Sequence, residues 1–243
     1  MTNSRPEPAR LAARERVIVA LDFPSAEQAL ALADRLKGLV QWFKVGLELY
    51  VAEGNRVIDQ LRSRGHSVFL DLKLHDIPNT VAGAVRSATR AGAQMLTLHA
   101  AGGPAMLAAA AEAAAALPEA PQLLAVTVLT SMDQSQLAAI GIPGSPADQV
   151  LRLAHMGWQS GIRGFVSSAE EVAAMRQAFP GAILVIPGIR PAGAAVGDQK
   201  RVATPAAAIA GGASYLVIGR PITQAVDPAA AAQAILSEIE SGS

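Results

Sequence analysis

In residues 67–76 the chain reads Ser67-Val68-Phe69-Leu70-Asp71-Leu72-Lys73-Leu74-His75-Asp76. Its first four residues are typical of a buried strand, but the run then acquires charges. Because side chains two positions apart in a strand share a face, Asp71 and Lys73 are expected to point the same way. The simplest interpretation is a strand that leaves the core and forms a surface ion pair, which contributes about 1 kcal/mol or less. Whether a surface ion pair is a sufficient explanation depends on the residues at the ends of the other predicted strands.

The size and composition of the chain limit its class. Its 243 residues are enough for one sizeable core, and single-domain α/β barrels commonly have this length. Lys plus Arg (20) equals Asp plus Glu (20), so no net charge favours nucleic acid or an anionic membrane as a partner. The absence of cysteine excludes disulfides and thiolate sites. The cytoplasm is the expected location.

The N-terminal residues 1–16 differ in composition from the rest. They mix arginines and glutamates around two prolines and contain no apolar core of a secretory signal, so we expect a disordered extension before a catalytic domain at 17–243. The longest apolar tract, residues 105–117, is rich in alanine and is interrupted by Glu112. It fits a helix of a soluble protein better than a membrane span.

Short apolar runs alternate with helical stretches along the whole chain. The predicted strands are residues 17–22, 41–45, 67–73, 94–99, 122–129, 163–167, 182–187 and 214–219. The predicted helices between them are residues 26–36, 55–64, 79–91, 104–117, 147–159, 169–179 and 205–210. Eight apolar strands alternating with helices predict a parallel sheet closed as a single-domain (β/α)₈ TIM barrel. An open, doubly wound sheet is the alternative.

Charged residues stand at the carboxyl ends of the first three predicted strands. Asp22 ends the first strand, Lys44 lies near the end of the second, and Asp71 with Lys73 ends the third. In a barrel these ends are neighbours on the face where active sites lie. We therefore expect a cluster of alternating acids and bases, each holding its neighbours in the charged form. Scattered surface pairs are not expected to fall at matching positions on three consecutive strands.

The ends of the seventh and eighth strands predict a phosphate site. Strand eight ends in Gly219-Arg220-Pro221, where the glycine admits a ligand, the arginine offers a planar fork and the proline can open a helix. The alternative is a plain turn with a solvated charge. The loop over residues 187–201 is long and rich in glycine and proline, which suggests a lid.

These motifs resemble the orotidine 5′-phosphate decarboxylase family of the bacterial type. The resemblance covers about residues 17–232 and rests most on the run from Asp71 to Thr80. The other matching segments are Leu21-Asp22, Phe43-Lys44-Val45-Gly46, Val128-Leu129-Thr130-Ser131, Pro187-Gly188-Ile189-Arg190 and Ile218-Gly219-Arg220.

The resemblance implies a reaction and a role for each matching residue. It implies a homodimeric barrel, without metal or organic cofactor, that converts orotidine 5′-monophosphate (OMP) to UMP and carbon dioxide. Lys73 would donate a proton to C6 of the pyrimidine, and Asp71 would lie beside the departing carboxylate. Asp22 and Lys44 would bind ribose hydroxyls, and Lys44 would also brace Asp71.

The remaining roles concern the partner subunit and the far side of the site. Asp76, a member of the catalytic set, would reach with Ile77 and Thr80 into the neighbouring subunit's site. Thr130 would contact the pyrimidine edge. The phosphate contacts implied by the resemblance are Arg190, Gln199, Gly219 and Arg220.

The chemistry of that reaction suits a fixed cation. Loss of carbon dioxide from an sp² ring carbon leaves a lone pair in the ring plane, where conjugation cannot spread it. A positioned ammonium can stabilise this charge and then deliver a proton. Of the histidines in this region, His75 is expected to be structural and His99 a hydrogen-bonded residue behind the site.

Two other functions remain open from the sequence. One is a magnesium-dependent phosphosugar enzyme of the hexulose-phosphate synthase or ketogulonate-phosphate decarboxylase kind, which shares an Asp-x-Lys-x-x-Asp core. That group typically has an acid where this chain has Lys44, because a carboxylate helps to hold the cation. The other is a barrel that only binds a nucleotide or phosphate, for which two lysines and three aspartates at the rim would have little use.

Overall fold

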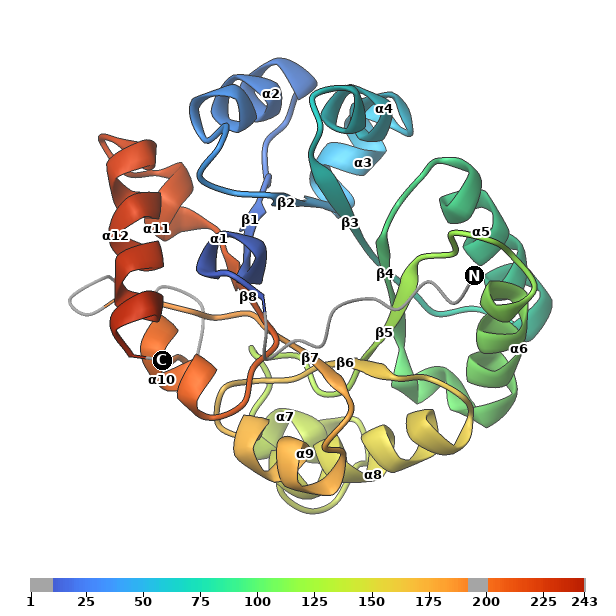
Figure 1. The fold of residues 1–243 in the computed structure, drawn as a ribbon. Helices are drawn as coiled ribbons and strands as arrows, with labels where there is room; N and C mark the ends of the chain where they lie inside the picture. The colour runs from blue at the N-terminus through green and yellow to red at the C-terminus, as the bar shows by residue number, and fades with distance from the viewer. Residues whose placement is uncertain (1–10, 192–200, 243) are drawn as a thin grey trace.

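Eight parallel strands form a closed barrel in the computed structural model, which describes residues 11–191 and 201–242. Each strand pairs with the next along the chain, and β8 (Tyr215–Ile218) returns to pair with β1 (Val17–Ala20). Helices surround the barrel (Figure 1). The predicted single-domain (β/α)₈ barrel is confirmed. The open, doubly wound sheet is wrong, because its edge strands would not pair with each other.

All eight predicted strands are present, and their bounds differ from the prediction by a few residues. The strands between β1 and β8 are β2 (Trp42–Gly46), β3 (Ser67–Leu74), β4 (Met95–His99), β5 (Gln122–Val126), β6 (Gly164–Val166) and β7 (Ile183–Ile186).

The seven predicted helices are also present. They are α2 (Ala26–Arg35), α4 (Arg56–Ser63), α5 (Pro78–Arg90), α6 (Gly103–Ala115), α8 (Pro146–Gln159), α9 (Val172–Ala178) and α10 (Pro205–Ala210). Helical segments that the sequence prediction missed are α1 (Ala13–Arg16), α3 (Leu47–Glu53), η2 (Ala100–Gly102), α7 (Gln134–Ala139) and α12 (Pro228–Ser241). The short α11 (Arg220–Thr223) lies where Pro221 was expected to open a helix. A signal for α12 exists, because Asp227 caps its first turn and Pro228 begins it.

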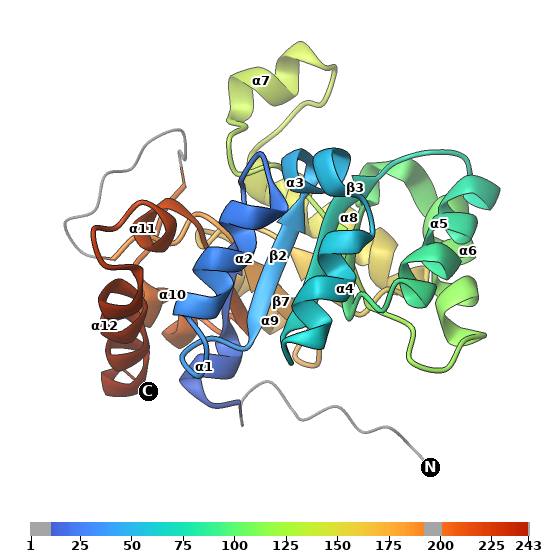
Figure 2. The same cartoon turned by 90° about the horizontal axis from the view of Figure 1, so that it is seen from above.

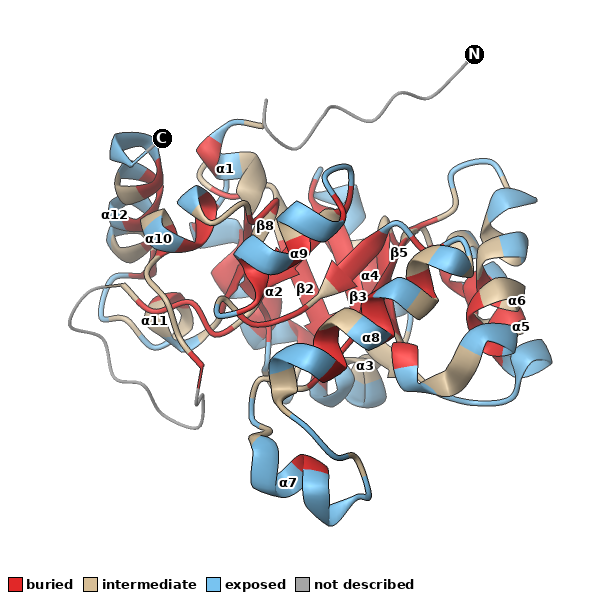
Figure 3. Ribbon diagram, turned by 90° about the horizontal axis from the view of Figure 1, so that it is seen from below, coloured by how far each residue is buried: buried red, intermediate tan, exposed pale blue. Residues whose placement is uncertain are grey.

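Side chains of the strands contribute to two apolar cores. Alternate residues fill the inside of the barrel, whereas their neighbours pack outward against the helices. The inner core consists of Ile18, Ala20, Phe69, Met95, Leu124, Val185 and Val217. Most strand residues are buried, with partly buried ones at the strand ends, while the helices expose their outer faces (Figure 3). Because the barrel interior is filled, a site for chemistry must lie at one of its ends.

The folded unit begins before residue 17, where the prediction placed its start. Helix α1 covers Ala13–Arg16, and the guanidinium of Arg16 donates to the carbonyls of Ala213 (3.2 Å) and Ser214 (3.4 Å). Residues 13–16 of the predicted extension thus form a helix that contacts the barrel, while residues 1–10 lie outside the described residues. Over 11–191 and 201–242, no helix has both the length and the apolar character that a membrane crossing requires.

The two ends of the barrel carry different elements. Helices α3 and α7 lie at the end where the strands finish, and α7 stands clear of the remaining structure (Figure 2). Helix α1 lies at the opposite end, where the strands begin. We call these the C-terminal rim and the N-terminal end.

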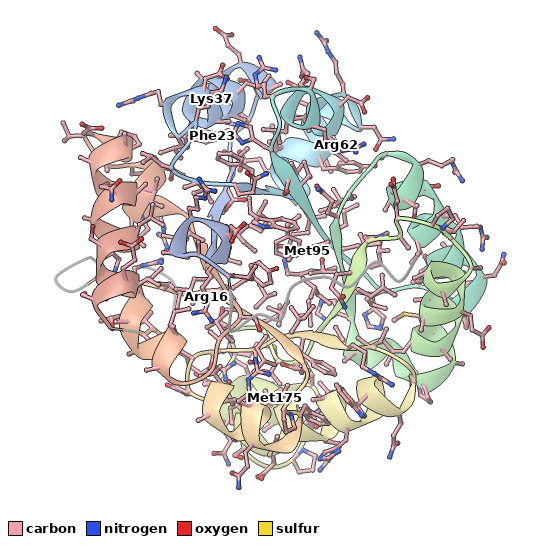
Figure 4. The ribbon with its side chains drawn as sticks, in the orientation of Figure 1. Arg16, Phe23, Lys37, Arg62, Met95 and Met175 are labelled. Atoms are coloured by element: carbon pink, nitrogen blue, oxygen red, sulfur yellow. The ribbon has the colours of Figure 1, made fainter. Side chains whose placement is uncertain are left out.

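Side chains at the N-terminal end bind mainly to backbone or to one another. The Gln94 amide accepts from the N–H of Val68 (2.8 Å) and donates to Ser67 Oγ (3.3 Å), while Gln41 donates to the Gly65 carbonyl (3.0 Å). A cavity of about 720 Å³ opens at this end, partly lined by Trp42, Met95 and Tyr215. In a view from this end, Arg16 and Met95 lie inside the ring of helices, whereas Lys37 and Arg62 lie in that ring (Figure 4).

Arg176 links two turns at the N-terminal end through hydrogen bonds to their carbonyls, and we call these contacts the arginine clamp. Arg176 donates to the carbonyls of Pro180 (2.7 Å), Ala182 (2.8 Å) and Gly212 (2.8 Å). Burial lowers the pKa of its guanidinium, and the nearby Arg16 lowers it further. The clamp joins the starts of β7 and β8.

Candidate active site at the C-terminal rim

Four charged side chains from three consecutive strands meet at the C-terminal rim, as predicted. The ammonium of Lys44 lies 2.9 Å from Asp22 Oδ1 and 3.6 Å from Asp71 Oδ2. The ammonium of Lys73 lies 2.9 Å from both carboxylate oxygens of Asp71. We call these four residues the rim cluster. Its unbroken order of acid, base, acid and base excludes the interpretation of one isolated surface pair.

Asp71 is the centre of the rim cluster. Its side chain is 11% exposed, and it contacts both ammonium groups and the hydroxyl of Thr97, which donates to Oδ1 over 2.9 Å. Burial by itself would raise the pKa of the Asp71 carboxyl, but the charges of Lys44 and Lys73, together with hydrogen bonds from Lys73 and Thr97, outweigh burial and lower that pKa. The carboxylate therefore stays ionised at neutral pH.

Lys73 is the cation of the cluster that an approaching molecule can reach. Its side chain is 32% exposed, against 11% for Lys44. The backbone of Lys73 is unusual, since its φ of 50° lies in the left-handed region that lysine rarely adopts. The pairing of β3 with β4 shifts register between Leu70 and Leu74, which indicates a bulge. The predicted contact with Asp71 is confirmed, but it is made from an irregular strand and not from the regular one expected.

The pair formed by Lys44 and Asp22 depends on a glycine that directly ends β2. A Cβ placed on Gly46 would lie 2.7 Å from Lys44 Nζ and 3.1 Å from Asp22 Oδ1. Residue 46 has a φ of −94°, which other residues also adopt, so the reason for a glycine is space and not backbone conformation. The sequence prediction did not identify this role.

Residues 75–80 leave the barrel as an exposed segment that ends with the first turn of α5. The carboxylate of Asp76 accepts a hydrogen bond from the backbone N–H of Ile77 (2.7 Å), and the Ile77 side chain is 67% exposed. Thr80 is exposed as well. Within this chain, the structure thus directs Asp76 into its own loop and not into the rim cluster.

Two histidines pack beside the cluster. The rings of His75 and His99 lie 5.5 Å apart between centroids. Burial lowers the pKa of His99, and the neighbouring His75 and Lys73 lower it further, so this imidazole is neutral at pH 7. A ring contact with His75 is the interaction that the structure gives for His99, where the sequence predicted a hydrogen bond.

The predicted phosphate residues lie at the ends of the later strands. Gly219 follows β8, and Arg220 is exposed at the start of α11. Thr130 is half-buried after β5. Arg190 is buried, and its guanidinium donates to the carbonyl of Ile189 (2.8 Å). Gln199 lies outside the described residues, as does most of the predicted lid.

A buried ion pair that the sequence prediction missed stands at the end of this loop. Arg201 pairs with Glu171 and also donates to the carbonyl of Leu129 (3.1 Å). The side chains of Arg201 and Glu171 are only 7% and 4% exposed. The pair therefore joins the loops that follow β5, β6 and β7.

The donor set of the rim suits a polar organic ligand. Across the described ranges, 11–191 and 201–242, no group of three or more His, Cys, Asp or Glu side chains is placed to hold a metal ion. The two carboxylates of the rim cluster instead share the ammonium of Lys44. Fixed charges of both signs beside a reachable ammonium can stabilise a developing anion and supply a proton.

Comparison with known proteins gives a consistent result. A family model described as orotidine 5′-phosphate decarboxylase / HUMPS family matches residues 15–235. The chain is 55% identical to an orotidine 5′-phosphate decarboxylase of Halorhodospira halophila, over 92% of this chain and 95% of the relative. It is 51% identical to the Moorella thermoacetica protein of the same name, over 95% and 94%. The structure of the Lactobacillus acidophilus decarboxylase superimposes with a TM-score of 0.82 at 39% identity, covering 93% of this chain and 99% of that one.

Proposed function

This chain belongs to the orotidine 5′-phosphate decarboxylase / HUMPS family, and we propose that it converts OMP to UMP and carbon dioxide, with Lys73 as the proton donor to C6. The carboxy-lyase activity is that of its named relatives. The observation that carries the mechanism is the Lys73 ammonium, which is held 2.9 Å from both oxygens of Asp71 at the reachable face of the rim cluster.

The rim cluster meets the electrostatic demand of this reaction. As the bond from C6 to the carboxylate breaks, its electron pair remains on C6 in the ring plane, and carbon dioxide leaves. An ammonium already fixed in place stabilises that pair without reorganisation and then transfers a proton to C6. The neutral Lys73 amine regains a proton from solvent before the next turnover.

The other members of the rim cluster hold and orient the substrate in this proposal. Asp71, kept anionic by Lys44, Lys73 and Thr97, lies beside the departing carboxylate. Asp22 and Lys44 bind the ribose hydroxyls, and their 2.9 Å ion pair gives the sugar one donor and one acceptor together.

Contacts to the phosphate and the pyrimidine edge come from the later strands. Arg220 offers an exposed guanidinium beside Gly219, which suits a phosphate. Thr130 contacts the pyrimidine edge, and Arg190 and Gln199 complete the phosphate side. Binding energy from the remote phosphate can then serve to order the pyrimidine over Lys73.

We also propose a homodimer whose sites are shared between subunits. The support is the exposed segment 75–80, where Ile77 presents an apolar side chain that is 67% exposed next to the acidic Asp76. Burial of Ile77 in a partner would place Asp76, Ile77 and Thr80 at the neighbouring rim. The reaction needs no metal or organic cofactor in this proposal, and the cytoplasm is its expected location.

The test follows the ultraviolet absorbance of OMP during turnover, with and without EDTA. We expect wild-type turnover to be insensitive to the chelator, and Lys73→Ala to lose about three orders of magnitude or more in kcat. Lys37→Ala, which removes an exposed lysine, is the matched control. Loss of wild-type activity in EDTA, restored by magnesium, would favour the phosphosugar type of site.

Mixing of inactive variants tests the shared site. Lys73→Ala and Asp76→Ala chains, unfolded together and refolded, should recover about a quarter of wild-type activity, because half the dimers carry one intact site. Each variant refolded alone is the control. A mixture no more active than its parents contradicts the shared site and leaves the decarboxylase proposal intact.

A further inference from the structure

The hydroxyl of Thr97, on β4, contacts both Lys73 and Asp71 of β3. The backbone N–H of Lys73 donates to Thr97 Oγ1 over 2.9 Å, and the same hydroxyl donates to Asp71 Oδ1 over 2.9 Å. We propose that Thr97 is a positioning residue for the reaction, which fixes the Lys73 backbone and the Asp71 carboxylate at the same time. This inference rests on the proposed function of Lys73.

The bulge in β3 explains why the Lys73 N–H needs this partner. In a regular parallel pair, the N–H groups of β3 that face β4 donate to its carbonyls. Between Leu70 and Leu74 the register shifts, and the N–H of Lys73 reaches a side chain instead. Thr97 is fully buried, at 0% exposure. The hydroxyl therefore satisfies a buried donor that solvent is not placed to satisfy.

The same contact supports an unfavourable backbone conformation. A non-glycine residue at φ of 50° costs on the order of 1 kcal/mol or more, so it persists only where the surroundings hold it. Thr97 supplies one such restraint from the neighbouring strand. The direction in which the Lys73 side chain leaves the backbone depends on this conformation.

The direction of the two hydrogen bonds is fixed. Because the hydroxyl accepts from the Lys73 N–H, its single proton is free to point to Asp71. This orients the carboxylate so that Oδ1 faces Thr97 and Oδ2 faces Lys44. A methyl group in place of the hydroxyl would release both partners together.

The test compares Thr97→Val with Thr97→Ser. Valine keeps the shape of threonine and loses the hydroxyl, whereas serine keeps the hydroxyl. For decarboxylation of OMP we expect Thr97→Val to lose kcat by about ten- to a hundredfold with KM changed less than about threefold. Thr97→Ser should stay within about threefold of the wild type in both constants.

The dependence of kcat on pH distinguishes the proposed hydrogen-bonding role of Thr97 from a packing role, because a packing role alone would not shift this dependence. Besides Thr97, the charged and titratable groups facing Asp71 are Lys44 from β2, Lys73 from β3 and His99 from β4. Removal of the Thr97 hydrogen bond raises the pKa of Asp71, because that bond is one of the contacts that lower it. The acid limb of kcat against pH should therefore move to higher pH in Thr97→Val and not in Thr97→Ser.

Hydrogen exchange checks the backbone without use of the activity. The peptide over residues 71–76, followed by mass spectrometry, should exchange several-fold faster in Thr97→Val than in Thr97→Ser. A Thr97→Val variant with wild-type kcat, or equal losses in both variants alongside equal losses of Tm, would overturn the inference. If the wild type fails to turn over OMP, the proposed function fails instead, and the exchange comparison still measures what Thr97 holds.

Discussion

The C-terminal rim and the N-terminal end of this barrel both place polar side chains at strand ends, but the side chains of the rim cluster bind different partners from those at the N-terminal end. At the rim, Lys44 and Lys73 bind the carboxylates of other side chains. At the opposite end, Gln94 and Arg176 bind backbone groups. Side chains that satisfy the backbone fasten turns and strands in place. Side chains that satisfy one another keep charges ready for a bound molecule, so the two ends divide stability and chemistry between them.

Left-handed backbone occurs at both ends of the barrel. At the N-terminal end it is adopted by glycines such as Gly92 (φ of 77°) and Gly212 (φ of 106°), where it carries little cost, but also by Glu119 (φ of 59°). At the rim it is adopted by Gly188 (φ of 76°) and by Lys73 (φ of 50°). Because Lys73 carries an ammonium of the rim cluster, its backbone strain coincides with a position where a particular side chain is needed.

Apart from the loss of Lys73, the largest expected effect is a loss of activity without a loss of stability at the rim. Lys44→Met removes a cation between two carboxylates, so we expect kcat/KM for OMP to fall by about two orders of magnitude. The midpoint of thermal unfolding should move little, because the two apolar cores are untouched. Steady-state assays and thermal denaturation measure the two quantities, with Lys37→Met as the control. A large loss of Tm with full activity would reverse the roles assigned to the two ends.

A variant at the N-terminal end tests the opposite expectation, a loss of stability without a loss of activity. Arg176→Met leaves the carbonyls of Pro180, Ala182 and Gly212 without their guanidinium donor. We expect the free energy of unfolding to fall by about 2 kcal/mol, with kcat of the folded protein unchanged. Urea denaturation measures the first, and Arg56→Met, at an exposed position, is the control. An unchanged urea midpoint would show that the clamp does not stabilise the barrel.

A smaller loss of activity is expected from a variant that tests how much space the rim cluster leaves around Lys44. Gly46→Ala places a methyl group 2.7 Å from Lys44 Nζ, so the flexible lysine must shift while the backbone can stay. We expect kcat/KM to fall about tenfold with Tm retained. Gly181→Ala is the matched control, because a Cβ there meets open space. Full activity in Gly46→Ala would mean that the position of Lys44 is less restricted than the geometry indicates.

The smallest expected effect is a dependence of stability on pH. The pKa of Asp71 is lowered in the folded state from its ordinary value of 3.8, so its stabilising contribution is complete well above pH 3.8. The contribution declines as the pH falls below 3.8 and vanishes below the folded-state pKa. The difference in free energy of unfolding between wild type and Asp71→Asn should therefore shrink on acidification. Urea titrations across this range measure it, and a constant difference would contradict the assigned cause.

The sequence predicted the barrel and the rim cluster because both follow from local pattern. Eight apolar runs and the charges at their ends can be read residue by residue, as Asp22 and Lys44 illustrate. The roles of Thr97 and Gly46 could not be read in that way. A threonine in an apolar strand looks like packing, and its function appears only when the bulge in β3 turns the Lys73 N–H toward it. Space around Gly46 likewise depends on side chains from other strands.

The pairing of β1 with β8 can form only after most of the chain has been synthesised. Arg16 binds the carbonyl of Ala213, which lies 197 residues later in the chain. At a synthesis rate of about 5–20 residues per second, the first strand waits roughly 10–40 s for its second neighbour to be translated. During that interval one edge of β1 has no partner from its own chain, and contacts so distant in sequence form slowly. Newly synthesised chains are therefore most exposed to aggregation before the ribosome releases them, and chaperones that bind early would act on this edge.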